Sequence, residues 1–368
     1  MRFPEFSGEW KMCTIGELTT KVGSGVTPRG GEAVYKTEGH PFVRSQNVGL
    51  GNLLLDDIAF IDEETHLRQK NTELQFNDVL LNITGASIGR SALVDKQIVG
   101  GNVNQHVCII RTKENLVPSF ICSFLLSNYG QRQIDSFQAG GNRQGLNFEQ
   151  IKSIKITIPS KDEQIKIAKL LRAIDERIAT QNKIIDKLQS LIKGVAQNVA
   201  RNNKPNIRLS ECLECSSSTL QESDVCKNGT YPVYGANGIV GYLNNYNTEK
   251  EAVYIIKDGS GVGTVSYVTG KCSATGTLNT LQAKEGYSLQ YLYYMLKVFN
   301  FEPYKTGMAI PHIYFKDYGK AKIFCPSYTK QLKYVGLLSA IDNKLSAEQS
   351  ILTDLRLQKQ YLLRQMFI

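Results

Sequence analysis

The sequence PSKDEQIKIAKLLRAID at residues 159–175 decides the fold, because a second version of it, PSYTKQLKYVGLLSAID, occupies residues 326–342. The two stretches share an opening Pro-Ser, a glutamine at the sixth position and the ending Ala-Ile-Asp. The same offset also aligns Phe148 with Phe315. A register kept over this length indicates that the chain consists of two copies of one unit.

Each copy continues into a long predicted helix. Its apolar residues follow one another in steps of four and three, which is the spacing of a coiled-coil seam. Gln181 interrupts the first seam, and Glu348 and Lys359 interrupt the second. The seam residues are Ile167, Leu171, Ile174, Ile178, Ile185, Leu188, Ile192, Val195 and Val199 in the first helix, and Tyr334, Leu338, Ile341, Leu345, Leu352, Leu355, Leu362 and Met366 in the second.

Each seam is too long to be covered by its own globular part, so we expect the two helices to cover each other. The sequence between them is long enough to permit parallel or antiparallel pairing. We predict an antiparallel coiled coil, which would relate the two units by a pseudo-two-fold axis. This arrangement would also bring Gln181 and Glu348 together near the axis as a polar contact that fixes the register.

The globular parts are predicted to be of the α+β class, because short β-rich runs alternate with glycine-rich loops. The predicted organisation has four parts. They are a globular domain at residues 1–158, a long helix at 159–203, a second globular domain at 204–325 and a second long helix at 326–368.

The composition excludes several classes of protein. Apolar residues make up 42% of the chain and charged residues 21%, so the chain can build cores. No run approaches the ~18–20 apolar residues of a membrane span, and the first residues, MRFPEF, lack the apolar region of a signal peptide. We therefore expect a cytoplasmic protein. The net charge of +9 favours nucleic acid as a partner only weakly, because the excess is spread along the chain.

No catalytic residue and no metal site are predicted. The chain lacks the G-x-x-x-x-G-K-[ST], G-x-S-x-G and H-E-x-x-H motifs, and it lacks the Asn/Asp-Pro-Pro-aromatic tetrad of amino-methyltransferases. Cys212 and Cys215 have the spacing of a zinc pair. The repeat, however, places Cys212 where the first copy has Leu18, so we interpret Cys212 as a core residue. The four histidines are dispersed without ligand spacing.

The polar, glycine-rich loops have two interpretations. They are ordinary surface turns, which Gly, Asn and Ser favour, or they form a surface that reads DNA. Asn and Gln suit adenine edges, Arg suits guanine, and Ser and Thr hold phosphates. The repeat favours the second interpretation, because Asn142-Arg143-Gln144 in one copy corresponds to Ala309-Ile310-Pro311 in the other. Two similar bodies with different tips would read two different short sequences.

Loop position and side-chain chemistry select the candidate DNA-contacting residues. In the first copy they are Arg29, Arg44, Gln46, Asn47, Thr84, Ser87, Arg90, Asn104, Gln105, Asn142, Arg143 and Gln144. In the second copy they are Tyr234, Asn237, Lys257, Ser260, Thr264, Thr277, Asn279, Thr280 and His312.

Three segments make the chain resemble the specificity subunits (HsdS) of type I restriction–modification systems. They are Arg2-Phe3-Pro4-Glu5-Phe6 with Trp10, Tyr231–Gly238 with Gly241-Tyr242, and Ile156–Pro159 leading through Glu163-Gln164 into the first helix. The resemblance covers essentially the whole chain. The second junction departs from it at Lys330, where the family usually has glutamate.

This resemblance implies two target recognition domains, each reading one part of a split double-stranded DNA sequence through the major groove, and paired helices that set the spacer. It also implies two methyltransferase (modification) subunits and motor-nuclease (restriction) subunits as partners. S-adenosylmethionine, ATP and magnesium would belong to those partners, and this chain would hold no cofactor. The alternatives are a non-catalytic coiled-coil scaffold and a silent recombination cassette copy of such a subunit. A self-contained DNA-modifying enzyme is a further alternative, against which the missing motifs argue.

Overall fold

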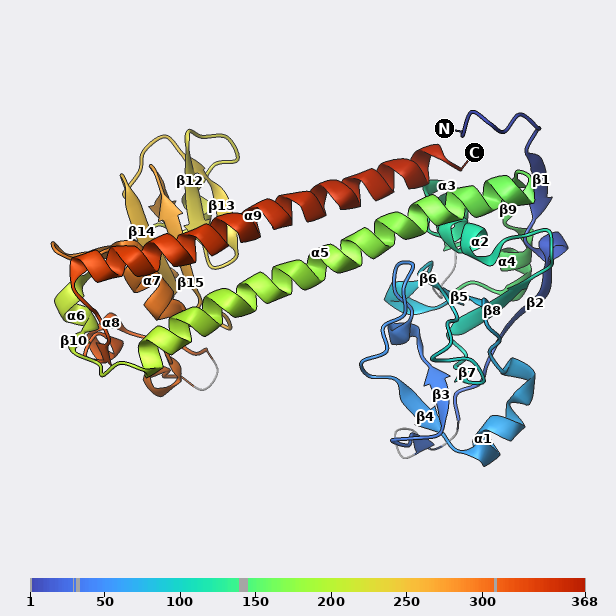
Figure 1. Cartoon of the computed structure of the whole chain (residues 1–368), viewed down its shortest axis with the longest axis horizontal. Helices are drawn as coiled ribbons and strands as arrows, with labels where there is room; N and C mark the ends of the chain where they lie inside the picture. Colours follow the sequence, from blue (N-terminus) through green and yellow to red (C-terminus); the bar gives the residue numbers. More distant parts are fainter. Residues whose placement is uncertain (1, 29, 31–33, 139–144, 308–309, 368) are drawn as a thin grey trace. The chain divides into compact units, whose positions relative to one another are not determined.

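The computed structural model describes residues 2–28, 30, 34–138, 145–307 and 310–367. The chain divides into two compact units. Unit 1 is Met1–Gln181 together with Ile351–Ile368, and unit 2 is Asn182–Ser350. Each unit contains small sheets, short helices and a part of both long helices (Figure 1). The predicted α+β class is therefore confirmed.

Unit 1 contains three small sheets. Its strands are β1 (Lys11–Thr14), β2 (Thr19–Ser24), β3 (His40–Val43), β4 (Ala59–Ile61), β5 (Val79–Asn82), β6 (Ser91–Leu93), β7 (Asn102–Val103), β8 (Val107–Thr112) and β9 (Lys155–Ile158). The strand orders are β2-β8-β5-β6, β4-β3-β7 and β1-β9. Every residue of β5 is buried, which explains why its sequence is a near-continuous apolar run rather than an alternating one.

The helices of unit 1 are α1 (Glu63–Arg68), α2 (Pro118–Leu125), α3 (Asn128–Gln138), α4 (Phe148–Ser153), the first part of α5 (Lys161–Arg201) and the last part of α9 (Tyr328–Gln365). Asp62 and Asn147 cap α1 and α4, because their side chains accept hydrogen bonds from the free amides of the first turn. One core joins the four-stranded sheet, α2 and α5. The long helix is thus part of the core and not an appendage.

Unit 2 repeats this arrangement. Its strands are β10 (Ile207–Arg208), β11 (Leu213–Ser217), β12 (Tyr231–Gly235), β13 (Gly238–Leu243), β14 (Glu251–Ile256), β15 (Val265–Thr269), β16 (Ser273–Ala274), β17 (Leu278–Ala283) and β18 (Lys322–Ile323). Its helices are the last part of α5, α6 (Leu209–Cys212), α7 (Leu289–Lys297), α8 (Phe315–Tyr318) and the first part of α9 (Tyr328–Gln365). The orders β11-β17-β14-β15, β13-β12-β16 and β10-β18 match those of unit 1 strand for strand.

The two units also share individual backbone hydrogen bonds at equivalent positions. In unit 1 the amide of Ile83 donates to the carbonyl of His106 (3.0 Å), and in unit 2 the amide of Lys257 donates to the carbonyl of Thr277 (3.0 Å). Ile83 is buried whereas Lys257 is half-buried. The two units therefore place different side chains on the same backbone frame, as the repeat predicted.

A repeated glutamine fastens each long helix to its unit. Gln164 is buried, its Oε1 accepts a hydrogen bond from the amide of Val117 (2.9 Å), and its Nε2 donates to the carbonyl of Pro159 (3.1 Å). Gln331 is also buried, and its Oε1 accepts from the amide of Ser288 (2.9 Å). Because a buried backbone amide is costly when it lacks a partner, this glutamine stabilises the junction between strand and helix.

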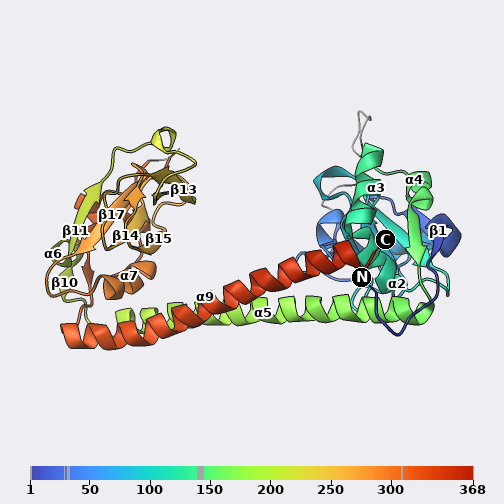
Figure 2. The ribbon, with the colours of Figure 1, turned by 90° about the horizontal axis from the view of Figure 1, so that it is seen from above.

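In unit 1 the first part of α5 packs antiparallel to the last part of α9 (Figure 2). Ile167, near the start of α5, shares a core with Phe367, just beyond the end of α9. Further along α5, Asp175 pairs with Lys359, which precedes Phe367 in the chain (2.6 Å). The ring of Phe367 lies 5.2 Å from that of Phe120 in α2, so the end of the chain completes the core of unit 1.

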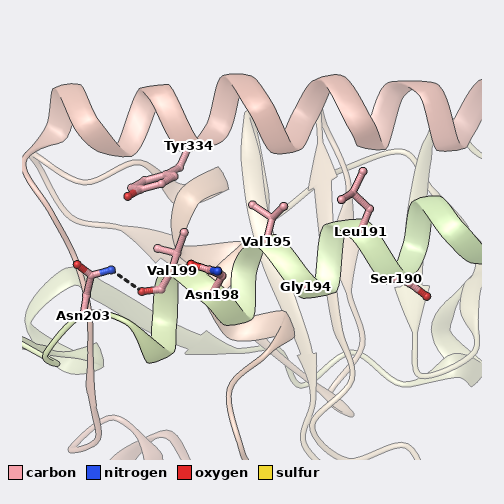
Figure 3. A pocket seen from close by; sticks show the side chains of 8 residues that line it. All are labelled: Ser190, Leu191, Gly194, Val195, Asn198, Val199, Asn203 and Tyr334. Atoms are coloured by element: carbon pink, nitrogen blue, oxygen red, sulfur yellow. Dashed lines mark hydrogen bonds between the residues drawn. The ribbon is translucent and has the colours of Figure 1, made fainter.

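In unit 2 the last part of α5 packs against the first part of α9. Tyr334, in the second turn of α9, faces Val195 and Val199 near the end of α5, so this pairing is antiparallel as well (Figure 3). Asn203 donates a hydrogen bond to the carbonyl of Val199 (2.9 Å) at the end of α5. The predicted antiparallel pairing is therefore confirmed within each unit. The pseudo-two-fold relation between the units and the contact between two polar seam residues stay predictions.

The core contribution of the chain end can be tested with the substitution Phe367→Ala. Because Phe367 is 2% exposed, the variant should destabilise unit 1 by about 3–5 kcal/mol through the cavity it leaves. The chain has one tryptophan, Trp10, whose ring lies 6.4 Å from that of Phe120, so tryptophan fluorescence during urea unfolding reports on unit 1.

The matched control is Leu357→Ala, a 58% exposed position on the same helix. It should change the stability of unit 1 by less than about 0.5 kcal/mol. An equally small loss for Phe367→Ala would contradict the role of the chain end in this core.

Candidate nucleic-acid interface

Two loops of unit 1 are tied together by a buried asparagine. They contain the short helices η3 (Ser45–Asn47) and η5 (Gly85–Ser87). Asn82, the last residue of β5, donates from Nδ2 to the carbonyl of Ser45 (2.8 Å) and to the Oγ of Ser87 (3.0 Å). One buried amide therefore sets the distance between two predicted DNA-contacting loops.

A tight turn at Asn104–Val107 lies beside η5. The backbone amide of Val107 donates a hydrogen bond to the carbonyl of Asn104 (3.3 Å) and so joins the two ends of the turn. The side-chain Oδ1 of Asn104 also accepts a hydrogen bond from the backbone amide of His106 (3.0 Å). Thr84 Oγ1 lies 2.6 Å from His106 Nδ1. Gln105 occupies the exposed tip of this turn. The turn thus presents one polar side chain from a firmly held backbone.

Three predicted residues gather around an aspartate that the sequence did not single out. Arg44 Nη2 donates to the carbonyl of Asp57 (2.8 Å), Asn47 Nδ2 donates to its carboxylate (3.0 Å), and the side-chain Nε2 of Gln46 donates to the same carboxylate. The Arg44 guanidinium also lies 5.4 Å from the ring centre of Tyr35. The carboxylate offsets the charge of the arginine, so this corner is polar and not strongly basic.

The predicted residues of unit 1 differ in exposure. Gln46, Arg90 and Gln105 are exposed, Arg44, Thr84 and Ser87 are half-buried, and Asn47 and Asn104 are buried. Arg29, Asn142, Arg143 and Gln144 lie outside the described residues. Gly145, which follows the last of these, forms a bridge to Thr84. All of these residues stay predictions as DNA contacts.

In unit 2 the corresponding surface is centred on Lys257. The amide of Ile313 donates to the carbonyl of Lys257 (2.9 Å), and Asp258 forms a bridge with His312. The glycine-rich loop at residues 258–263 therefore lies beside the segment that carries His312.

A second element of this surface joins β12 to the turn before β17. The amide of Thr275 donates to the carbonyl of Tyr234 (2.8 Å), and its Oγ1 lies 2.8 Å from that of Thr277. The ring of Tyr234 packs 5.7 Å from that of Tyr254, and burial raises the pKa of the Tyr234 hydroxyl. Tyr234 therefore stays a neutral donor or acceptor at ordinary pH.

The predicted residues of unit 2 are also spread over a range of exposure. Asn237, Ser260 and Thr264 are exposed, Tyr234, Lys257, Thr277 and His312 are half-buried, and Asn279 and Thr280 are buried. Asn279 accepts from the hydroxyl of Ser217 (3.2 Å) and donates to the hydroxyl of Tyr318 (3.1 Å). Its amide is thus engaged inside the unit.

Sequence reasoning missed His106, Asp57 and Asn82. His106 could have been found, because it follows Gln105 in the same polar run, GGNVNQH. Asp57 and Asn82 carry no local signal, since their partners lie in other loops and only the fold brings them together.

Cys212 is buried, and burial raises the pKa of its thiol to about 12. This agrees with the interpretation of Cys212 as a core residue. Within residues 2–28, 30, 34–138, 145–307 and 310–367, no group of three or more His, Cys, Asp or Glu side chains is arranged to hold a metal ion. Among these same residues, no helix combines the length and the apolar character needed to cross a membrane.

Comparison with known proteins identifies the family. The model of the type I restriction modification DNA specificity domain matches residues 7–190 and 205–356. A putative type I specificity subunit of Mycoplasma genitalium is 25% identical over 320 residues, which cover 79% of this chain and 81% of the relative. The EcoKI specificity subunit of Escherichia coli is 22% identical over 202 residues, 52% of this chain and 41% of that protein.

Solved structures show the same fold. The S subunit of a type I restriction–modification system from M. genitalium superposes with a TM-score of 0.65 at 18% identity, covering 100% of this chain and 97% of that one. A chain from a study of complex assembly in a type I restriction–modification system has a TM-score of 0.58 at 16% identity, covering 98% and 97%. Together with the family match, this means that the chain belongs to the type I restriction–modification DNA specificity domain family and carries two copies of the domain.

The role of Asn82 in holding the loops can be tested with Asn82→Ala. Losing both side-chain hydrogen bonds should cost about 1–3 kcal/mol and should release η3 and η5 from each other. Hydrogen exchange should then speed up at the amides of both loops. Asn71→Ala, at an exposed position of the same unit, should leave these rates unchanged. Unaltered exchange in the Asn82 variant would contradict this role.

Proposed function

We propose that this chain is the DNA-reading subunit of a type I restriction–modification complex, in which each unit binds one part of a split, asymmetric DNA sequence through the major groove. The observation that carries the proposal is a shared backbone frame with different tips. Gln105 at the tip of one turn corresponds to Gly276 in unit 2, and Thr84 corresponds to Asp258. Different side chains on one frame suit two different base sequences.

Cations near these tips support a role in holding the DNA backbone. Arg90 is exposed directly after the η5 loop, and Lys257 is half-buried at the centre of the unit 2 surface. Arg and Lys contacts to phosphates position a protein on DNA without reading its sequence, and they make binding dependent on salt.

Exposed apolar residues on the long helices support docking of two methyltransferase subunits, one on each unit. In unit 1, Leu357 and Tyr361 are 58% and 53% exposed and line a groove together with Arg364. In unit 2, Leu191 is 50% exposed and lines a groove with Val195 (Figure 3). Large apolar side chains gathered on a surface mark sites of interaction.

Family membership supports the remaining parts of the proposal. Motor-nuclease subunits join the complex for restriction, and S-adenosylmethionine, ATP and magnesium belong to the partner subunits. This chain contributes recognition while the partners contribute catalysis. The paired helices set the number of unspecified base pairs between the two half-sites.

The test is genome-wide methylation mapping in a host that carries the partner methyltransferase, with and without this gene. The expected result is a new motif of two short, different half-sites around a fixed gap. Stable assembly with the methyltransferase and no new motif would indicate a silent copy. Failure to assemble would indicate a scaffold. Either outcome contradicts the proposal.

The docking grooves can be tested by counting bound methyltransferases. Tyr361→Glu should block the groove of unit 1 and leave one methyltransferase per chain instead of two, because a buried unpaired carboxylate is strongly unfavourable. Native mass spectrometry of the copurified complex measures this ratio. Leu67→Glu, which is at a 53% exposed position of α1, is the control and should keep two. Two bound methyltransferases in the Tyr361 variant would exclude this groove.

A further inference from the structure

We propose that Gln105 reads an adenine in the half-site bound by unit 1, and that Thr84 and His106 are positioning residues that fix its side-chain amide. This inference rests on the proposed DNA-reading function and deepens it, because it assigns one type of base to one side chain.

The backbone around Gln105 is held on both sides. The preceding amide, that of Asn104, donates to the carbonyl of Val43 (3.0 Å), and the following carbonyl, that of His106, accepts from the amide of Ile83 (3.0 Å). Gln105 itself is exposed at the tip of the turn. A polar side chain on such a frame can contact a ligand without the cost of ordering a loop.

The imidazole of His106 determines which way the amide of Gln105 faces. His106 Nδ1 lies 2.6 Å from Thr84 Oγ1, and His106 Nε2 lies 3.4 Å from Gln105 Nε2. A neutral imidazole has one N–H and one lone pair. Because the amide nitrogen of Gln105 can only donate, His106 Nε2 is the acceptor, and His106 Nδ1 therefore donates to Thr84.

This arrangement leaves Gln105 with Oε1 as an acceptor and the second hydrogen of Nε2 as a donor. Adenine presents the complementary pair in the major groove, with N6 as a donor and N7 as an acceptor. Guanine presents two acceptors there, and one of them would face the acceptor Oε1. Adenine is therefore the base that satisfies both groups of Gln105.

Unit 2 has no glutamine at the corresponding turn. The corresponding turn has Gly276 at its tip, and the amide of Gly276 donates to the carbonyl of Leu220 (2.8 Å). A Cβ atom at this position would lie 3.1 Å from the carbonyl oxygen of Ser218. The backbone of a neighbouring segment therefore crowds the position that a side chain would take, and the effect of Gln105 is confined to one half-site.

The test is methylation mapping with the full-length chain and its methyltransferase, comparing wild type with Gln105→Glu. The variant exchanges the donor–acceptor pair for acceptors alone, which suit the N4 amine of cytosine. At one position of one half-site, the preference for adenine should fall by about ten- to a hundredfold or shift to cytosine. The other half-site and the gap should not change. Gln97→Glu, at another exposed position of unit 1, is the control and should keep the wild-type motif.

Thr84→Val and His106→Phe test the positioning role. Both should relax the discrimination at that same base position, because the amide of Gln105 is then free to turn. A merely structural role would lower methylation at all sites and leave the base preference intact, which would contradict the positioning role.

An unchanged motif in Gln105→Glu overturns the inference. A uniform loss of methylation without a change of base preference also overturns it, since Gln105 would then be a phosphate or structural contact. Absence of any bipartite motif with the wild-type chain is a different result, because it refutes the proposed function itself.

Discussion

Packing of the apolar seams of α5 and α9 is the interaction on which both units depend. In unit 1 the end of the chain supplies Leu362, Met366 and Phe367 to a core whose other buried residues all precede Gln181. In unit 2 the start of α9 supplies Tyr334, which packs against the end of α5 (Figure 3). The core of unit 1 therefore requires a helix segment from the other end of the sequence. The closure of such a long loop is a cost that the buried apolar surface must offset.

The packing of the two long helices determines which residues the fold requires and which can differ between the two units. Seam residues, the buried glutamines Gln164 and Gln331, and the backbone hydrogen bonds of the frame serve the fold in both units. The side chains at the loop tips are not needed for the fold, because the hydrogen bonds that the two units share join backbone atoms. Gln105 and Gly276 occupy the same position on the frame with different chemistry. A duplicated fold can in this way carry two different binding surfaces.

The fold could be predicted from the sequence because its signals are local or periodic. Alternating steps of three and four predicted the long helices, and α5 spans Lys161–Arg201 where residues 159–203 were expected. The candidate surface was less predictable. Asn47 and Asn279 have the chemistry of DNA contacts, yet both are buried and bonded within their own units. A polar residue in a loop does not reveal its partner, because that partner comes from a segment far away in the sequence.

We propose that each unit reads its own half-site. An exchange of domains tests it most directly: the segment from β10 to β18 is replaced by the segment from β1 to β9, whose ends form the equivalent two-stranded sheet. Methylation mapping of the exchanged chain with its methyltransferase should yield a motif in which both parts carry the half-site of unit 1, with the gap unchanged. A motif that still contains the half-site of unit 2 would show that unit 2 does not read it.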